Sequence, residues 1–160
     1  MASRLFIFGT GSHARKVYHY AVKCGWKVVA FIDEAVDAMA PIPALPVLQL
    51  DDLGAPTNDD AMFIAIGRAD VRLRLMDRMS KAGWNLPALV HVSAWVAPDA
   101  ELEAGVLVAA GAVVETAALV ERGAIIDIGV LLDHECQVGA FCHLRAGEVY
   151  GPRSNIPSPV

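Results

Sequence analysis

Residues 90–149 read VHVSAW VAPDAE LEAGVL VAAGAV VETAAL VERGAI IDIGVL LDHECQ VGAFCH LRAGEV, an unbroken series of ten hexapeptides. The first position holds Val, Leu or Ile in all ten units, and the fifth holds Ala, Val or Cys in nine, with Glu148 as the exception. A large aliphatic side chain at one fixed position and a small one at another fill the narrow interior of a coil. The repeat therefore predicts a parallel β-helix.

Upstream of the repeat, apolar runs alternate with helical patterns, which predicts a parallel sheet in a small Rossmann-like α/β unit over residues 1–89. The stretch 35–60 is rich in Ala, Pro and Asp and is expected to be a loop. In the second helix the arginines, Arg72 among them, are expected off the apolar stripe. The expected strands are residues 4–8, 27–32, 61–66 and 86–90, and the expected helices end near Gly25 and cover residues 70–82.

The first expected strand ends in Gly9-Thr-Gly-Ser-His13, which fits part of the dinucleotide-binding fingerprint. Glycines let backbone N–H groups approach a phosphate, and the N-terminus of the following helix favours negative charge. Asp33, at the end of the second strand, stands where a carboxylate would contact a ribose. A tight turn without a ligand is the alternative. His13 favours a phosphate-bearing ligand, and the short unit favours a nucleotide sugar over NAD.

Composition argues against several classes of protein. The 160-residue chain has a formal net charge of −5 and no basic cluster, so nucleic acid is not an expected partner. The three cysteines show no CxxC spacing, which favours a reducing compartment. No signal peptide and no membrane-spanning run are recognised, so a cytoplasmic protein without membrane contact is expected. The scattered histidines predict no metal site.

The eighth hexapeptide, residues 132–137, departs from the scaffold pattern because Asp133, His134 and Glu135 stand side by side. A neighbouring carboxylate can fix the tautomer of a histidine and raise its basicity, which makes His134 a candidate general base. Adjacent residues of a strand point to opposite faces. A contact between His134 and Glu135 therefore requires a corner, and Asp133 is an alternative partner.

Five motifs follow one another in the chain: Phe8-Gly-Thr-Gly-Ser-His13, Phe31-Ile-Asp-Glu34, Ile64-Ala-Ile-Gly67, Leu132-Asp-His-Glu-Cys136 and Phe141-Cys-His143. Together they resemble the sialic acid O-acetyltransferase-like group, which includes N-acetyltransferases of UDP- or GDP-linked 4-amino sugars and has a left-handed β-helix. The resemblance implies a homotrimeric enzyme that moves an acetyl group from acetyl-CoA to the 4-amino group of a nucleotide-linked sugar. A sugar hydroxyl as acceptor, or a non-catalytic module for sugar-nucleotide binding or trimerisation, remains an alternative.

The resemblance also implies roles for single residues in the two halves of the chain. It implies that Gly11, Ser12 and His13 contact phosphate, that Asp33 and Glu34 contact the nucleoside, and that Gly67 closes the pocket. It further implies that His134 is the catalytic base, that Glu135 supports it, and that His143 touches acetyl-CoA, in active sites between adjacent β-helices.

The end of the repeat differs from this pattern. The β-helix is expected over residues 90–151, and residues 152–160 are expected to be a non-repeat tail, because the repeat fails at Glu148 and three prolines follow. The resemblance implies further coils that hold most of the CoA. Little or no acetyltransferase activity is therefore expected of this chain.

Overall fold

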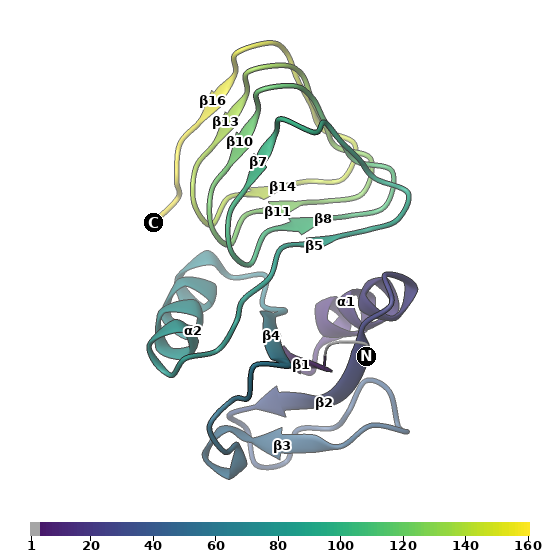
Figure 1. Ribbon diagram of the computed structural model, residues 1–160, viewed down its shortest axis with the longest axis vertical. Coiled ribbons are helices and arrows are strands. Elements are labelled where there is room, and N and C mark those ends of the chain that lie inside the picture. Colours follow the sequence, from purple (N-terminus) through teal and green to yellow (C-terminus); the bar gives the residue numbers. More distant parts are fainter. Residues whose placement is uncertain (1–3) are drawn as a thin grey trace. The chain divides into compact units, whose positions relative to one another are not determined.

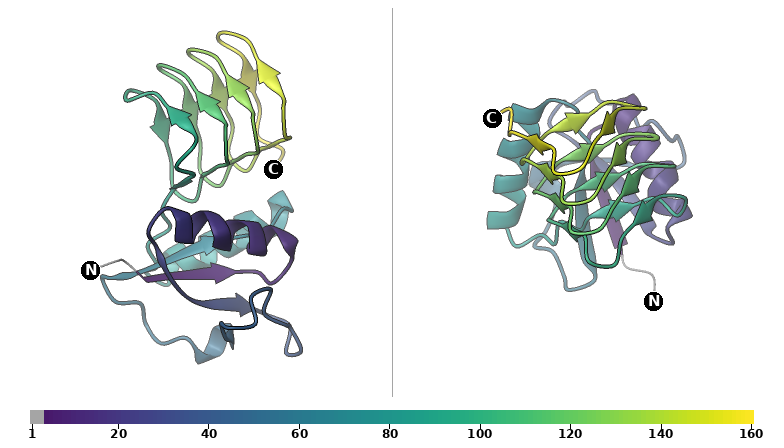
Figure 2. Two further views of the ribbon diagram at one scale, coloured as in Figure 1. Left: turned by 90° about the vertical axis from the view of Figure 1, so that its right-hand side faces the viewer. Right: turned by 90° about the horizontal axis from the view of Figure 1, so that it is seen from above.

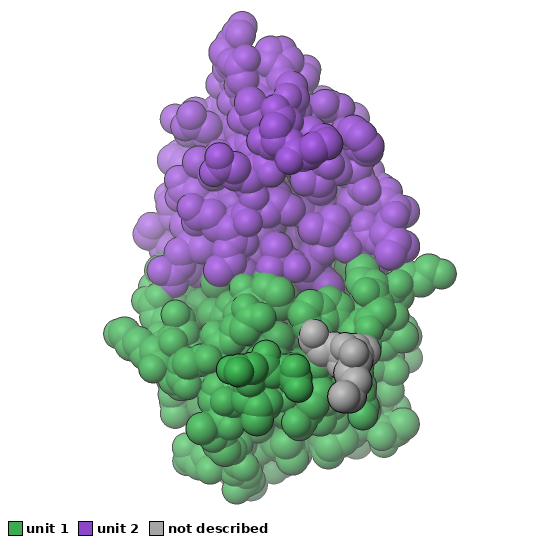
Figure 3. All heavy atoms as spheres, in the orientation of Figure 1, with its two compact units in different colours: residues 1–87 green, residues 88–160 purple. Residues whose placement is uncertain are grey.

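The computed structural model describes residues 4–160, so the first three residues of the expected N-terminal unit lie outside the described residues. The chain divides into two compact units, unit 1 up to Pro87 and unit 2 from Ala88 (Figure 3). The boundary comes two residues earlier than expected because Leu89 and Val90 already pair with a strand of unit 2.

Unit 1 is a four-stranded parallel sheet in the order β3-β2-β1-β4, with α1 and α2 on opposite sides of the sheet (Figures 1 and 2). None of the described helices is both long and apolar enough to cross a membrane. The elements are β1 (Arg4–Phe8), α1 (Ser12–Lys23), β2 (Lys27–Asp33), β3 (Val47–Gln49), the 3-10 helix η1 (Leu50–Asp52), β4 (Asp60–Ile64) and α2 (Ala69–Lys81).

The core of unit 1 follows the predicted pattern. All five residues of β4 are buried, and the apolar face of α1 buries Ala14, Val17 and Ala21. Two predictions about the strands and loops of this half are wrong. The expected loop contains β3, an edge strand of three residues that is too short to show a period of its own. Residues 86–90 add no strand to this sheet, because only Asn85 bridges to Ala61 and the chain then enters the β-helix.

Unit 2 is a parallel β-helix built from strands of two residues, which are the sixth and first positions of successive hexapeptides. Each strand pairs with the one eighteen residues later, as Glu101 pairs with Leu119, so three hexapeptides make one coil (Figures 1 and 2). The three sheets are β5-β8-β11-β14, β6-β9-β12-β15 and β7-β10-β13-β16. Their strands are β5 (Leu89–Val90), β6 (Trp95–Val96), β7 (Glu101–Leu102), β8 (Leu107–Val108), β9 (Val113–Val114), β10 (Leu119–Val120), β11 (Ile125–Ile126), β12 (Leu131–Leu132), β13 (Gln137–Val138), β14 (His143–Leu144), β15 (Val149–Tyr150) and β16 (Asn155–Ile156).

The interior of the coil is the one that the repeat predicts. First-position residues such as Val120 and Ile126 are fully buried beside fifth-position residues such as Ala124 and Cys136. The fourth position forms the corners, and its backbone is left-handed in every hexapeptide from Gly105 to Arg153. Glycine adopts this conformation freely, whereas other residues pay roughly 1–2 kcal/mol for it.

Contrary to the expected non-repeat tail, the coil continues to β16, which pairs with β13. Tyr150 and Ile156 keep the first-position phase and pack against the core. At the fifth position Glu148 and Ser154 are polar where the earlier units hold Ala, Val or Cys, which conceals the repeat in the sequence. The strands β15 and β16 remove one ground for expecting little activity, the failure of the repeat at Glu148, and the expectation itself stays a prediction.

Candidate functional site

The carboxyl ends of β1, β2 and β4 meet at one edge of the sheet in unit 1. Phe8 is in register with Ile32 and with Ile64, so the segments that leave the three strands start side by side. The strand order reverses here, and ligands of open α/β sheets bind at such a point. The six residues predicted to bind the substrate all lie in these segments: Gly11, Ser12, His13, Asp33, Glu34 and Gly67.

The turn between β1 and α1 packs tightly on one side and is open on the other. Gly9 has a φ of 115°, and a Cβ there would lie 2.9 Å from Ile66 Cδ1 and 3.0 Å from the carbonyl oxygen of Ala65. A Cβ at Gly11 or Gly67 would meet nothing within 4 Å. Gly11 caps α1 without a side-chain hydrogen bond, and the first turn holds no acidic residue. The N–H groups of this turn can therefore receive an anion.

The two predicted nucleoside contacts already have partners within unit 1. Asp33 accepts a hydrogen bond of 2.6 Å from the Thr10 hydroxyl and one of 3.0 Å from the Ala35 N–H, so it fixes the glycine turn to the end of β2. Glu34 pairs with Arg74 at 3.2 Å and with Arg78 at 3.1 Å.

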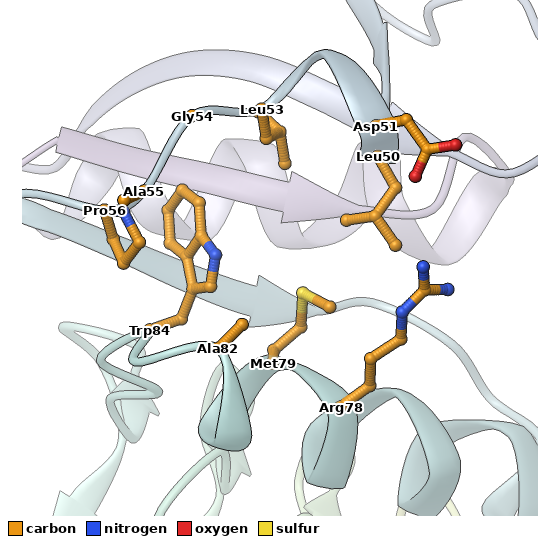
Figure 4. A pocket seen from close by; sticks show the side chains of 10 residues that line it. All are labelled: Leu50, Asp51, Leu53, Gly54, Ala55, Pro56, Arg78, Met79, Ala82 and Trp84. Atoms are coloured by element: carbon orange, nitrogen blue, oxygen red, sulfur yellow. The ribbon is translucent and has the colours of Figure 1, made fainter.

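Two hollows lie along the α2 side of unit 1. One, of about 220 Å³, is lined by Glu34, Gln49, Leu50, Asp51 and Arg78, so it adjoins a predicted nucleoside contact. The other, of about 250 Å³, lies between the segment from Leu50 to Pro56 and the end of α2, with Trp84 on its wall (Figure 4). It contains no predicted substrate residue.

In unit 2, His134 and Glu135 form the turn after β12. Glu135 has a φ of 60°, and this left-handed backbone turns its carboxylate toward the preceding ring, so that Glu135 Oε1 lies 3.5 Å from His134 Nδ1. The side chains are 38% and 51% exposed. Asp133, the alternative partner, instead accepts a hydrogen bond of 2.7 Å from the backbone N–H of His134. The corner that the contact requires is thus present.

Arg153 is a neighbour that the sequence analysis missed. Its guanidinium Nη1 lies 3.7 Å from Glu135 Oε2, and its backbone N–H donates to the carbonyl of His134 over 2.9 Å. Arg153 follows Glu135 by eighteen residues, which is one coil. The coil period could have identified it.

His143 belongs to a second polar cluster, in β14. Its Nε2 lies 3.4 Å from Asp127 Oδ2, with the two side chains 23% and 17% exposed. Nearby, the Tyr150 hydroxyl donates to Glu148 over 2.7 Å, and this hydrogen bond lowers the pKa of Glu148. Burial and the same carboxylate raise the pKa of Tyr150 to about 12.

Known proteins match both units. Residues 4–79 match the family described as PglD N-terminal domain. PerB from Caulobacter crescentus, solved in complex with CoA and GDP-perosamine, is 33% identical, with a TM-score of 0.74 over 87% of this chain and 67% of that chain. A histidine-to-alanine mutant of GDP-perosamine N-acetyl transferase from the same organism, in complex with the same molecules, is 30% identical, with a TM-score of 0.83 over 96% of this chain and 76% of that chain.

The acetyltransferase domain of PglB from Neisseria gonorrhoeae matches with a TM-score of 0.81 over 98% of this chain and 86% of that chain. At 19% identity this match shows the fold alone. The predicted fold class, a Rossmann-like α/β unit followed by a left-handed parallel β-helix, is confirmed.

Proposed function

Because this chain belongs to the family of nucleotide-linked amino-sugar N-acetyltransferases, we propose that it moves an acetyl group from acetyl-CoA to the 4-amino group of a UDP- or GDP-linked sugar. The observation that carries this proposal is the contact of 3.5 Å between His134 and Glu135 at a left-handed corner. The left-handed backbone recurs at every corner from Gly105 to Arg153, so the paired histidine and carboxylate, and not the backbone conformation, distinguish this corner.

His134 acts as the general base in this proposal. The amine attacks the thioester carbonyl carbon, the new C–N bond forms, and the C–S bond to CoA breaks. The ring of His134 takes the proton that leaves the nitrogen and passes it to the CoA thiolate, which restores the neutral imidazole. Glu135 holds the ring and stabilises the imidazolium, a role that its carboxylate can fill at 3.5 Å with modest movement.

The sugar nucleotide binds at the carboxyl edge of the sheet in unit 1. Gly11, Ser12 and His13 hold the diphosphate at the N-terminus of α1, where exposed N–H groups and the helix dipole favour negative charge. Asp33 and Glu34 lie at the end of β2 on the nucleoside side, and the open space over Gly67 leaves room for the ligand.

Acetyl-CoA binds along the β-helix, with His143 as one contact. Asp127, 3.4 Å from the ring, keeps that imidazole in a fixed orientation. The protein assembles as a homotrimer, and an exposed apolar column in the sheet β6-β9-β12-β15 supports this assembly: Trp95, Leu131 and Val149 are 54%, 41% and 68% exposed.

Acetyl transfer by the chain and its His134 variants tests the proposal. The wild-type protein should release CoA from acetyl-CoA in the presence of a UDP- or GDP-linked 4-amino sugar. His134→Ala and His134→Asn should lower kcat by about 10²–10⁴-fold, with KM for both substrates little changed. His91→Ala, another histidine of the β-helix, serves as the matched control.

Three results would contradict parts of the proposal. Unchanged kcat in the His134 variants would remove His134 as the base. Acetylation of a sugar hydroxyl, such as that of sialic acid, without acetylation of a 4-amino sugar would replace the amine acceptor. Binding of a sugar nucleotide without turnover would favour the non-catalytic module.

A further inference from the structure

Arg72 is a charged residue in a place that does not suit a charge. The helical pattern predicts this residue off the apolar stripe of α2, but its side chain is only 1% exposed and lies on the buried stripe with Leu75, Met76 and Met79. Removing a guanidinium from water costs roughly several kcal/mol unless hydrogen-bond acceptors compensate for the lost water. Its position in the first turn of α2 is also unfavourable for a cation, because the positive end of the helix dipole lies there.

The guanidinium of Arg72 donates hydrogen bonds to the backbone, which an apolar side chain of similar length could not do. Its Nη1 donates to the carbonyl oxygen of Ile66 over 2.7 Å and to that of Gly67 over 2.9 Å. One nitrogen thus holds two successive carbonyls of the segment between β4 and α2.

Holding these carbonyls fixes the direction of the N–H groups that follow them. In a planar trans peptide the C=O of one residue and the N–H of the next point in opposite directions. The N–H groups of Gly67 and Arg68 therefore point away from Arg72. Outside the helices and strands of residues 4–160, no backbone hydrogen bond has the N–H of Gly67 or of Arg68 as its donor.

The same segment borders the proposed substrate site. Ile66 lies against Gly9, where a Cβ would come within 2.9 Å of its Cδ1, so the segment is adjacent to the glycine turn after β1. Gly67 is exposed, and the space where its Cβ would stand is open to 4 Å. A phosphate bound over Gly67 would lie beside the first turn of α2, whose one carboxylate, Asp70, is already paired with Arg68, and near the buried cation of Arg72.

We propose that Arg72 is a positioning residue of the sugar-nucleotide site, which holds the Ile66–Gly67 segment so that the N–H groups of Gly67 and Arg68 face the diphosphate of the substrate. This inference rests on the proposed function, because it takes the carboxyl edge of the sheet as the place where the nucleotide binds. Arg72 itself does not touch the substrate.

Calorimetry of the whole chain with GDP and with UDP tests this role. Arg72→Met fills the same space without the two hydrogen bonds, and we expect it to weaken binding of the preferred nucleotide by about tenfold or more. Arg72→Lys keeps the charge and one donor and should restore part of the affinity. Lys81→Met removes an exposed cation from the other end of α2 and should bind as the wild type does.

Kinetics separate positioning from a purely structural role. In Arg72→Met, KM for the sugar nucleotide should rise while kcat and KM for acetyl-CoA stay near the wild-type values. A general loss of structure would change all three and lower Tm. If Arg72→Met does not fold, folded Arg72→Lys decides the question, because weaker nucleotide binding supports the role and unchanged binding overturns it.

The outcomes distinguish this inference from the proposed function. If the wild type and Arg72→Met bind the nucleotide equally well, Arg72 has no positioning role and the proposed function stands. If the wild type binds neither GDP nor UDP, the sugar-nucleotide site and the role of Arg72 are both overturned.

Discussion

At the scale of single residues, one backbone conformation recurs at the fourth position of nine consecutive hexapeptides, from Gly105 to Arg153. Five of these residues are glycine, and three of the four others, Ala117, Glu135 and Arg153, stand eighteen residues apart in one corner. His134 precedes one of them. At Glu135 the left-handed backbone brings a carboxylate to the histidine. The contact of this carboxylate with His134, rather than a preference for left-handed backbone, therefore explains why a glutamate stands at this corner.

Replacing Glu135 by glycine should therefore stabilise the fold and impair the reaction. Glycine avoids a cost of roughly 1–2 kcal/mol for a left-handed residue, and the greater entropy of its unfolded chain offsets roughly 0.5–1 kcal/mol of that gain. We expect Tm to rise by a few degrees, about 0.5–1 kcal/mol in stability, while kcat falls. Thermal unfolding and acetyl-transfer assays measure the two effects.

Ala117→Gly is the matched control, because Ala117 has the same backbone conformation one coil earlier. It should raise Tm and leave kcat unchanged. A lower Tm in Glu135→Gly, or an unchanged kcat, would contradict the role that we assign to this corner.

The residues of the candidate site were only partly predictable. His134 and Glu135 are adjacent in the sequence, so their proximity was visible there, whereas Asp127 and Arg153 reach their partners through the period of the coil. Arg72 was misplaced because a helical pattern assigns charged side chains to the solvent face, and only the structure shows the carbonyls that compensate its burial. The partners of Asp33 and Glu34 come from other segments that the sequence does not align.

At the scale of elements, the prediction succeeded where one physical constraint acts on many residues. The first position of each hexapeptide must fill the coil, and this gave the strands of the β-helix their phase. The strand β3 was not predicted, because three half-buried residues at the edge of a sheet are too few to show an alternation of apolar and polar residues. The last coil was not predicted because polar Glu148 and Ser154 depart from the Ala, Val or Cys of the fifth position, although Tyr150 and Ile156 keep the phase of the first.

The start of β4 carries a pH-dependent contribution to stability. Asp60 is 7% exposed, accepts hydrogen bonds from the Thr57 N–H (2.9 Å) and hydroxyl (2.8 Å), and pairs with Arg4 at 3.3 Å. These partners, the Thr57 N–H foremost, lower the pKa of Asp60 below 3.8 in the folded protein. The contribution is therefore present above the pKa of the unfolded chain, about 3.9, and is lost as the pH falls through the lower folded value.

Asp60→Asn should lower the free energy of unfolding at pH 7 by about 1–3 kcal/mol, because the charge-assisted hydrogen bonds are lost. The difference from the wild type should shrink as the pH falls below about 3.9, where the unfolded chain takes up a proton at Asp60, and should be smallest below the lower pKa of the folded carboxyl. Urea unfolding at pH 7 and at pH 3, followed by tryptophan fluorescence, measures this. Asp59→Asn, at the exposed neighbouring residue, should change little, and an equal effect of Asp60→Asn at both pH values would contradict the linkage.

At the scale of the whole molecule, the chain joins two units that are stabilised in different ways. Unit 1 buries a sheet between two helices, whereas unit 2 stacks coils that each contact their neighbours (Figure 2). In stacked coils the outward-facing side chains of one sheet lie above one another in a column, so the column can be apolar or polar along the whole β-helix. In the sheet β7-β10-β13-β16 the sixth position holds Glu101, Leu119, Gln137 and Asn155, three of which are polar, but in the sheet β6-β9-β12-β15 all four are apolar: Trp95, Val113, Leu131 and Val149.

The apolar column should be the surface through which the proposed homotrimer forms. We expect the wild-type chain to sediment as a trimer at micromolar concentration and Leu131→Glu to sediment as a monomer, because a carboxylate in the middle of the column would lose its water on assembly. Gln137→Glu adds the same charge to the polar sheet and should remain trimeric. If catalysis needs adjacent β-helices, Leu131→Glu should also lose activity while its unfolding transition persists. A monomeric wild type, or a Leu131→Glu variant with unchanged mass, would exclude this surface as the interface.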